Sequence, residues 1–199
     1  LTRSWYANMR AIVANPSSYL YLTPLRKTND GSWKLPSIND CPQYDSWKWG
    51  LSDGGTEDVP YRDRALPDSS TTQELIDLFR QRQITYLAGS LDVCNQTEPD
   101  HLVAPDGYHC HSHGLETTCM DMLQGSNRIE RSNNFMESLQ HVWDKPDKCH
   151  NRVIVDGVGH DHSYMFNSQE GMEAIFGTGI KDQCNVSAAK SSFLKQALL

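Results

Sequence analysis

The chain has 199 residues, of which 38% are hydrophobic, and this is enough for a single domain with a sizeable core. Its formal net charge of −7 at pH 7 argues against nucleic acid as a partner, because phosphate binding requires a basic face. No run of residues approaches the roughly 18 apolar residues that a membrane-spanning helix requires.

The amino-terminal part predicts one buried strand followed by a long irregular segment. Residues 1–10 have a helical composition and read as if the sequence were entered partway, so we expect the single unit, residues 1–199, to be incomplete at its amino terminus. Residues 11–18 predict a short strand that ends in a Pro-Ser turn. Residues 19–60 carry four of the nine prolines and several tryptophans, which indicates an irregular insertion. It is either a cap lining a substrate cleft over the sheet or a surface loop with aromatic anchors.

A helix and a strand are predicted next. From Thr71 to Gln81, apolar residues recur at helical spacing, and the serines and threonines before them can act as N-caps. The sequence from Ile84 to Asp92 then predicts a strand. The carboxylate of Asp92 is therefore expected where that strand ends.

Residues 95–148 begin with a histidine-rich part and continue as a helical pattern. Histidines two positions apart in an extended segment point to the same side, which leaves a metal-binding interpretation open. We expect no metal site, because Cys110 is more economically explained as a disulfide partner. From Leu115 the pattern is helical as far as Trp143, with a break predicted around Gly125. The four histidines are His101, His109, His111 and His113.

A further strand is predicted to deliver a histidine. Residues 153–155 are consecutive β-branched valines and isoleucine, which suit a strand buried on both faces of a parallel sheet. Gly157 and Gly159 allow a sharp turn, so His160 falls at the carboxyl end of the strand, where open α/β sheets bind ligands. A helix over 168–176 completes the alternation of strands and helices. The pattern predicts an α/β fold with a predominantly parallel sheet flanked by helices.

The two strand ends predict a pair of interacting side chains. A carboxylate at Asp92 would hold the imidazole of His160 in one tautomer and stabilise its protonated form. This is the acid and histidine half of a Ser-His-Asp triad, in the order Asp then His. We predict that a ring nitrogen of His160 lies within hydrogen-bond reach of Asp92 at one end of the sheet. The alternative is that both are ordinary polar loop residues.

Cysteines and glycosylation sequons favour a secreted or lumenal protein. Six cysteines form an even set without a CxxC pair, which gives little support to a zinc ribbon or a redox motif. Asn95 and Asn185 each begin an N-x-S/T sequon. Together these features indicate disulfides formed in an oxidising compartment. The predicted pairs are Cys94 with Cys119, Cys110 with Cys149 and, by elimination, Cys41 with Cys184.

Four stretches resemble, in this order, the carboxyl-terminal half of a secreted α/β-hydrolase related to serine esterases and polyester depolymerases. They are AIVANPSSYLYL, YLAGSLDVCN, LETTCMDMLQGSNRIER and VDGVGHDHSYMF, and they extend over roughly residues 8–176. GVGHDHSYMF and QGSNR are the most specific parts. The resemblance implies an α/β-hydrolase-like fold, Asp92 as the acid, His160 as the general base and no cofactor. It also implies a G-x-S-x-G nucleophile elbow just before Leu1.

Three functions follow as hypotheses. The first is the carboxyl-terminal chain or fragment of an esterase-like serine hydrolase, whose serine lies upstream of Leu1 because Ser4 lacks flanking glycines and Ser90 lies inside a strand. This chain would need an amino-terminal partner chain from the same precursor and would act on a small ester or a polyester. The second is a non-catalytic structural or binding subunit with the same fold. The third is a metal-binding module that uses the histidines from His101 to His113.

Overall fold

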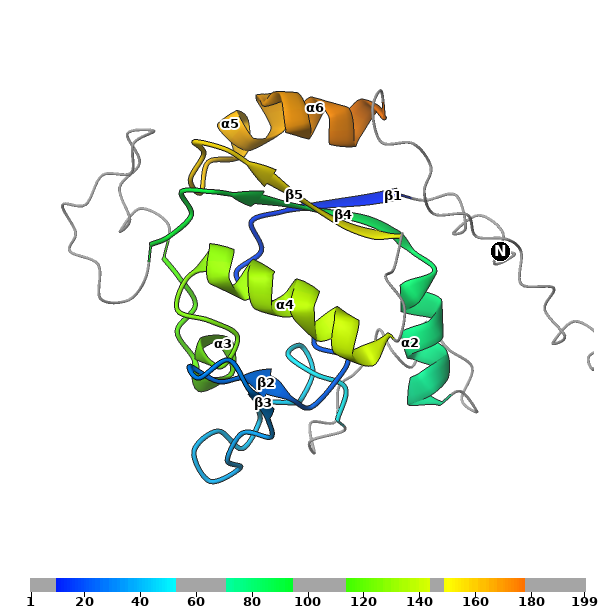
Figure 1. Ribbon diagram of the computed structural model, residues 1–199, viewed down its shortest axis with the longest axis vertical. Helices are drawn as coiled ribbons and strands as arrows, with labels where there is room; N and C mark the ends of the chain where they lie inside the picture. The colour runs from blue at the N-terminus through cyan, green and yellow to red at the C-terminus, as the bar shows by residue number, and fades with distance from the viewer. Residues whose placement is uncertain (1–9, 53–70, 95–113, 144–148, 178–199) are drawn as a thin grey trace, which may run out of the picture.

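The computed structural model describes residues 10–52, 71–94, 114–143 and 149–177, which form a parallel sheet covered by helices on both faces (Figure 1). The strand order is β1-β4-β5, and β4 pairs in parallel with both of its neighbours. A small antiparallel hairpin, β2-β3, forms a second sheet. The strands are β1 (Arg10–Ala14), β2 (Arg26–Lys27), β3 (Trp33–Lys34), β4 (Gln83–Gly89) and β5 (His150–Val155).

The helices form layers on either side of the sheet. Figure 1 shows α5 and α6 over one face and α4 over the other, with α3 and the β2-β3 hairpin beyond α4. The predicted α/β class, with a parallel sheet flanked by helices, is confirmed, whereas a hydrolase-specific fold stays a prediction. None of the described helices is both long and apolar enough to cross a membrane. The helices are α2 (Thr72–Arg80), α3 (Cys119–Met122), α4 (Arg128–Val142), α5 (His162–Asn167) and α6 (Gln169–Phe176).

Local side-chain chemistry sets the helix boundaries. Thr71 accepts a hydrogen bond from the Glu74 amide and donates its own amide to the Glu74 carboxylate, and this capping box begins α2 where a helix was predicted. Gly125 separates α3 from α4 at the predicted break, with a φ of +148° that favours glycine. The Asn127 side chain then accepts the Glu130 amide at 2.9 Å and caps α4.

Two apolar clusters cover the two faces of the sheet, as expected for parallel strands. The cluster on the α4 side is largely aromatic, and the rings of Tyr19 and Phe135 stack with centroids 4.5 Å apart. The cluster on the α5-α6 side is aliphatic and includes Leu87 and Met165, both 0% exposed. The buried members of the first cluster are Tyr19, Tyr21, Leu22, Ile76, Tyr86, Phe135, Leu139 and Trp143.

The core begins inside the segment that the sequence suggested as an insertion. Residues 19–60 are described as far as residue 52, and Tyr19 and Tyr21 both pack on Phe135 of α4. Further along, Lys27 of β2 pairs with Glu137 of α4 at 2.7 Å. The described part of the segment therefore packs against the α4 layer, and its role in lining a substrate cleft stays a prediction.

Arg26 organises the rest of this segment, which has little secondary structure. Its side chain is 1% exposed, and its guanidinium lies 4.3 Å from the centroid of the Tyr21 ring. It donates to the main-chain oxygens of Tyr44 at 2.9 Å and Trp49 at 3.1 Å, and it pairs with Asp45 at 3.4 Å. Burial lowers the pKa of Arg26 from its ordinary value. One buried cation thus joins distant parts of an otherwise irregular chain.

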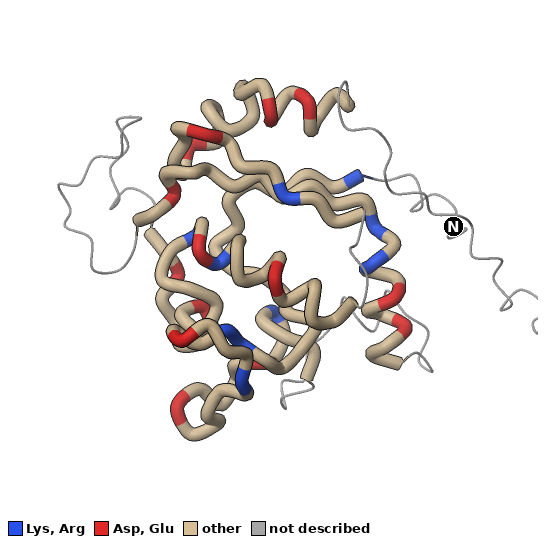
Figure 2. Tube along the Cα trace, viewed as in Figure 1, with Lys and Arg blue, Asp and Glu red and all other residues tan. Residues whose placement is uncertain are grey.

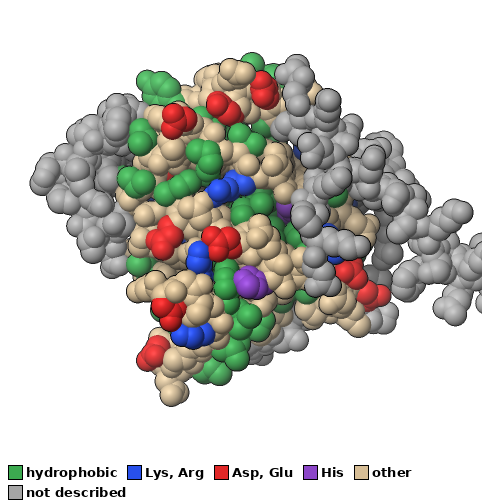
Figure 3. Space-filling view, viewed as in Figure 1, with side chains coloured by type: hydrophobic (Ala, Val, Ile, Leu, Met, Phe, Trp, Pro, Cys, Tyr) green, Lys and Arg blue, Asp and Glu red, His purple; other side chains and the backbone are tan. Residues whose placement is uncertain are grey.

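Charged side chains are distributed over the described surface. Figure 2 shows lysines and arginines scattered along the trace, while the α5-α6 layer carries acidic residues. Figure 3 shows acidic and basic side chains interspersed on the face that carries α4. The described residues therefore form no concentrated basic face, which agrees with the expectation of no nucleic-acid partner. That expectation stays a prediction.

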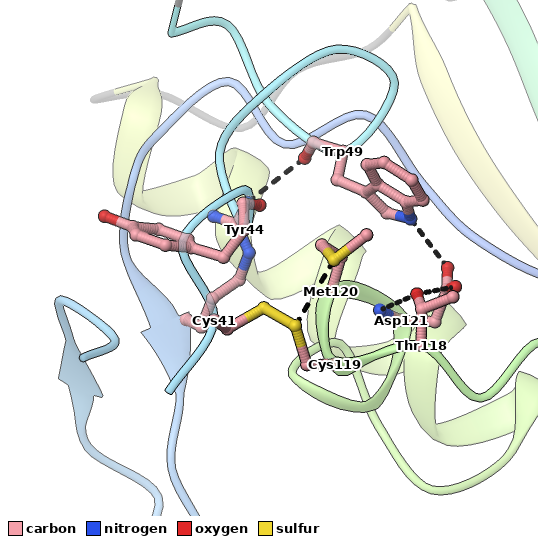
Figure 4. Close-up of a disulfide and its surroundings, with 8 residues drawn as sticks. Cys41, Tyr44, Trp49, Thr118, Cys119, Met120 and Asp121 are labelled. Atoms are coloured by element: carbon pink, nitrogen blue, oxygen red, sulfur yellow. Dashed lines mark hydrogen bonds between the residues drawn. A yellow bond between two sulfur atoms is a disulfide. The ribbon is translucent and has the colours of Figure 1, made fainter. Parts of the chain in front are cut away.

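A disulfide between Cys41 and Cys119 ties the segment to α3 (Figure 4). Beside it, the indole nitrogen of Trp49 donates to Asp121 Oδ1 at 2.8 Å, which adds a second link between the same two regions. Thr118 caps the short helix and donates its hydroxyl to Asp121 Oδ2 at 2.5 Å. A covalent bond and a buried carboxylate therefore hold the irregular segment in place.

The cysteine connectivity corrects two predicted pairs. Cys119 lies against the segment of Cys41, with 5.8 Å between their Cα atoms, and neither cysteine is available to another partner. Cys94 and Cys149 are also disulfide-bonded. The predicted bond between Cys110 and Cys149 lies outside the described residues, because Cys110 does. The two pairs that were wrong are Cys94 with Cys119 and Cys41 with Cys184.

Replacing both Cys41 and Cys119 by serine should lower the free energy of unfolding. The two cysteines are 78 positions apart in the sequence, and for a loop of this length the chain-entropy model gives about 4.5 kcal/mol. Urea denaturation of the double variant measures this loss. Non-reducing peptide mapping that joined Cys119 to any cysteine other than Cys41 would contradict the assignment.

Stability should fall at alkaline pH because two tyrosines are buried. Burial raises the pKa of Tyr19 from 10.0 to about 12 and also raises that of Tyr21. Since the folded-state pKa exceeds the unfolded value, this contribution is complete below about pH 10 and is lost as the pH rises to about 12. We expect Tyr19 to account for about 2–3 kcal/mol of the loss, measured by denaturation at each pH. Tyr19→Phe should flatten the pH dependence, and Tyr164→Phe, at a 60% exposed position, should leave it unchanged.

Candidate functional site

The predicted acid and base meet at the carboxyl-terminal end of the sheet. His160 Nδ1 lies 2.9 Å from Asp92 Oδ2. Asp92 follows β4 and His160 follows β5, which are neighbouring parallel strands. The Asp92 side chain is 1% exposed and that of His160 is 25% exposed. The predicted contact is confirmed, and its catalytic role stays a prediction.

Main-chain hydrogen bonds fix Asp92 to both β5 and α4. The Ser90 amide donates to the carbonyl oxygen of Val155 at 3.0 Å, so strand pairing continues past the end of β4. The amide of Ile129, in the first turn of α4, donates to the carbonyl oxygen of Asp92 at 3.2 Å. The backbone that carries the acid is thus held from two sides.

The side chain of Ser90 closes the turn that leads to the histidine. Its hydroxyl donates to Asp156 Oδ1 at 3.0 Å and accepts the Gly157 amide at 2.9 Å. Gly157 has a φ of +69°, a left-handed conformation that glycine adopts without strain. This agrees with the sharp turn that the sequence predicted at this position. Ser90 thus lies in the turn after β4 and not inside the strand where the sequence analysis placed it, and its hydroxyl is bonded within that turn.

Asn15 connects the acid strand to the histidine turn. It follows β1, is 8% exposed and has a φ of +43°, which asparagine tolerates better than most residues. Its Nδ2 donates to the carbonyl oxygen of Gly159 at 2.9 Å, and its Oδ1 accepts the Gly89 amide at 2.8 Å. Gly159 precedes His160, and Gly89 ends β4. The Asn15 side chain thus links the end of β4 to the turn before His160. The sequence analysis did not identify Asn15.

Gly89 allows the histidine turn to lie directly on β4. A Cβ atom at this position would be 2.3 Å from the carbonyl oxygen of Val158 and 2.7 Å from that of Gly159. Both oxygens belong to the main chain, which cannot rotate away as a side chain can. The absence of a side chain at Gly89 is therefore a requirement of the site.

Arg128, at the start of α4, is a second charged partner of Asp92. Its Nη1 lies 3.6 Å from Asp92 Oδ1, and the arginine side chain is 3% exposed. Its Nε donates to Ser17 Oγ at 3.1 Å, and its Nη2 donates to the carbonyl oxygen of Gly114 at 2.8 Å. The sequence analysis did not single out this residue, although the QGSNR stretch contains it. An arginine in the first turn of a helix usually lies in solvent, which is why composition alone does not reveal it.

The geometry defines which ring nitrogen can act as a base. An ionised carboxylate only accepts hydrogen bonds, so the Asp92 contact requires the proton on His160 Nδ1. Nε2 then carries the lone pair that can accept a proton. The neighbouring carboxylate stabilises the imidazolium that forms. The pair can therefore take up a proton at Nε2 and return it.

A serine with the spacing of a nucleophile motif occurs in residues 50–54, GLSDG, which the sequence analysis overlooked. Ser52 forms an isolated bridge with Ser46, and its hydroxyl donates to the carbonyl oxygen of Asp45 at 2.8 Å. It follows turns and not a strand, so the described residues around it lack the strand that leads into a nucleophile elbow. Ser4, the other serine considered, lies outside the described residues.

The remaining predicted sites fall outside the described residues. These are the histidines from His101 to His113 and the sequons at Asn95 and Asn185. Within the described ranges, no group of three or more His, Cys, Asp or Glu side chains could hold a metal ion. The metal-binding hypothesis therefore stays untested at its own residues.

A groove of about 1320 Å³ lies between the β2-β3 hairpin and α4. Its charged lining residues include two ion pairs, Lys27 with Glu137 at 2.7 Å and Lys34 with Asp30 at 3.1 Å. Neither the acid nor the histidine of the site contributes to its lining. We therefore keep this groove separate from the candidate site, in spite of its size.

Comparisons with known proteins include a distant structural similarity. No family model and no curated protein matches the chain. A crystal structure of LpqC, a poly(3-hydroxybutyrate) depolymerase from Bordetella parapertussis, superposes with a TM-score of 0.42 and 16% sequence identity. The match covers 76% of this chain and 35% of that structure, so this chain spans about a third of its length. A similarity at this level does not assign the chain to a family.

Variants of Asn15 should lower stability more than an equivalent change at the surface. Asn15→Asp keeps the acceptor for the Gly89 amide but places a carboxylate oxygen against the Gly159 carbonyl, which should cost about 1–3 kcal/mol of unfolding free energy. Asn15→Gly keeps the backbone conformation and loses both hydrogen bonds, so it should also destabilise. Urea denaturation measures both, with the exposed Asn29→Asp as the control. Equal effects at positions 15 and 29 would show that the bridge contributes nothing.

Proposed function

We propose that this chain is the carboxyl-terminal part of an esterase-like serine hydrolase and supplies the acid and the histidine of its triad. The observation that carries the proposal is the 2.9 Å contact between His160 Nδ1 and Asp92 Oδ2 beyond two adjacent parallel strands. A carboxylate that orients an imidazole in this way is the acid and base arrangement used in acyl transfer. The resemblance of the GVGHDHSYMF stretch to esterase sequences supports a carboxylic ester, small or polymeric, as the substrate.

In this mechanism, His160 Nε2 removes the proton from a serine hydroxyl as its oxygen attacks the ester carbonyl. Asp92 holds the ring through Nδ1 and stabilises the imidazolium. The same Nε2 then gives its proton to the departing alcohol, which leaves an acyl-enzyme. A water molecule activated by His160 then attacks the acyl-enzyme, which releases the carboxylic acid product and restores the serine hydroxyl. The His160 side chain is 25% exposed, whereas Asp92 is buried, so the base is the member of the pair that substrate can reach.

We place the nucleophilic serine upstream of Leu1, on a segment that pairs with β1. Ile12 of β1 packs against the α5-α6 cluster and Val13 against the α4 cluster. Apolar residues on both faces are typical of an interior strand in a parallel sheet. In the described part of the sheet, β1 pairs with β4 along one edge. The other edge is suited to a strand from an amino-terminal chain of the same precursor, because unpaired apolar edges favour pairing.

We also infer a secreted or lumenal location. Four cysteines fall within the described residues, Cys41, Cys94, Cys119 and Cys149, and all four are disulfide-bonded. Such bonds persist in oxidising compartments. The sequons at Asn95 and Asn185 are compatible with glycosylation there.

A fluorophosphonate probe, which labels activated serines covalently, tests the proposal on the protein isolated from its natural source. We expect peptide mass spectrometry to find the label on a serine that precedes Leu1. In the recombinant precursor, His160→Ala and Asp92→Asn should each lower kcat for p-nitrophenyl butyrate by at least about 10³-fold, because the triad acts as a unit. Ser52→Ala is the matched control and should leave turnover unchanged.

Other results would contradict the upstream position of the nucleophile or the catalytic role itself. Labelling of Ser52, or loss of turnover in Ser52→Ala, would overturn the upstream position of the nucleophile. Turnover by residues 1–199 alone that depends on His160 would do the same. Unlabelled native protein without esterase activity would support the non-catalytic subunit.

A further inference from the structure

The carboxylate of Asp92 has two oxygens in different environments. Oδ2 faces His160 Nδ1 at 2.9 Å. Oδ1 accepts no hydrogen bond from the described residues, and its charged neighbour is Arg128 Nη1 at 3.6 Å. The side chains of Asp92 and Arg128 are 1% and 3% exposed. Bulk water therefore does not hydrate the charge on Oδ1. A buried carboxylate is retained as an ion only when it is paired.

Arg128 is itself fixed in place by contacts on two other nitrogens. Its Nε donates to the hydroxyl of Ser17, in the segment that follows β1, and its Nη2 donates to the carbonyl oxygen of Gly114. Its own position is the first residue of α4, and the next residue, Ile129, donates its amide to the Asp92 carbonyl. The first turn of α4 therefore contacts Asp92 twice, through the main-chain amide of Ile129 and through the side chain of Arg128.

We propose that Arg128 is a positioning residue for the Asp92 and His160 pair. It neutralises Oδ1 and fixes the side-chain rotamer of Asp92, so that Oδ2 faces the imidazole. This inference rests on the proposed function for its catalytic meaning, but the positioning itself concerns a contact that can be measured without substrate. Arg128 acts through Asp92 and does not take part in proton transfer.

A neighbouring arginine provides a matched control. Arg131 lies one turn further along α4 and is 0% exposed. Its guanidinium donates to the carbonyl oxygens of Gly125 at 2.9 Å, Ser17 at 2.5 Å and Glu116 at 2.7 Å. It thus holds the same surrounding loops as Arg128, but its described contacts do not include Asp92. A purely structural role would make the two arginines equivalent.

The test uses the complete protein with ¹⁵N-labelled histidine. The deshielded Nδ1 proton of His160, assigned by its absence in His160→Gln, reports the hydrogen bond to Asp92. Arg128→Gln should remove this proton signal and lower kcat for p-nitrophenyl butyrate by about 10²-fold with KM unchanged, as expected when a reacting group is misplaced. Arg128→Lys restores a cation and should recover the signal and part of kcat. Arg131→Gln should keep the signal and kcat even where it lowers stability.

Two results would overturn the proposal. One is a retained Nδ1 signal in folded Arg128→Gln. The other is an equal loss of the signal in Arg128→Gln and Arg131→Gln, which would assign a general structural role to both arginines. If Arg128→Gln does not fold, Arg128→Met against Arg131→Met gives the same comparison, because methionine also removes the positive charge while it keeps an unbranched side chain. A protein without esterase activity whose Nδ1 signal still depends on Arg128 would refute the proposed function and support the positioning role.

Discussion

A buried negative charge at the end of β4 is the constraint on which the surrounding structure depends. Asp92 is 1% exposed, and an ion in that position destabilises a fold unless opposite charges and hydrogen bonds compensate for lost hydration. The first turn of α4 provides a cation in Arg128 and a main-chain amide in Ile129, while His160 contacts the remaining oxygen. The start of α4, the loop after β1 and the turn after β5 are therefore arranged around one carboxylate.

Much of the fold could be predicted because its signals are local. Hydrophobic periodicity, N-caps and glycines predicted α2, the break between α3 and α4, and the three strands of the main sheet. The contact of Asp92 with His160 followed from one general rule, because the carboxyl ends of neighbouring parallel strands lie at one edge. The six-residue helix α5 was missed since it is too short for a periodic pattern.

The features that could not be predicted depend on contacts between distant parts of the chain. Asn15 and Arg128 act through groups far away in sequence, and each is an unremarkable polar residue when considered locally. The bond of Cys41 with Cys119 depends on how the segment after β1 packs on α3, which cysteine spacing does not encode. Tyr19 and Tyr21 lie in the core although a proline-rich, irregular stretch surrounds them.

The close approach at Gly89 limits how the site can move. Because a main-chain oxygen of the histidine turn occupies the space that a methyl group would need, that turn rests on β4 without an intervening side-chain layer. Side chains at an interface can change rotamer and so accommodate a shift of one element against another. Two main chains in direct contact lack this adjustment. The turn that carries His160 is therefore not free to swing like a hinged loop while the strand that leads to Asp92 stays in place. Asp92 and His160 are therefore held in one rigid unit, and movements around them involve other parts of the molecule.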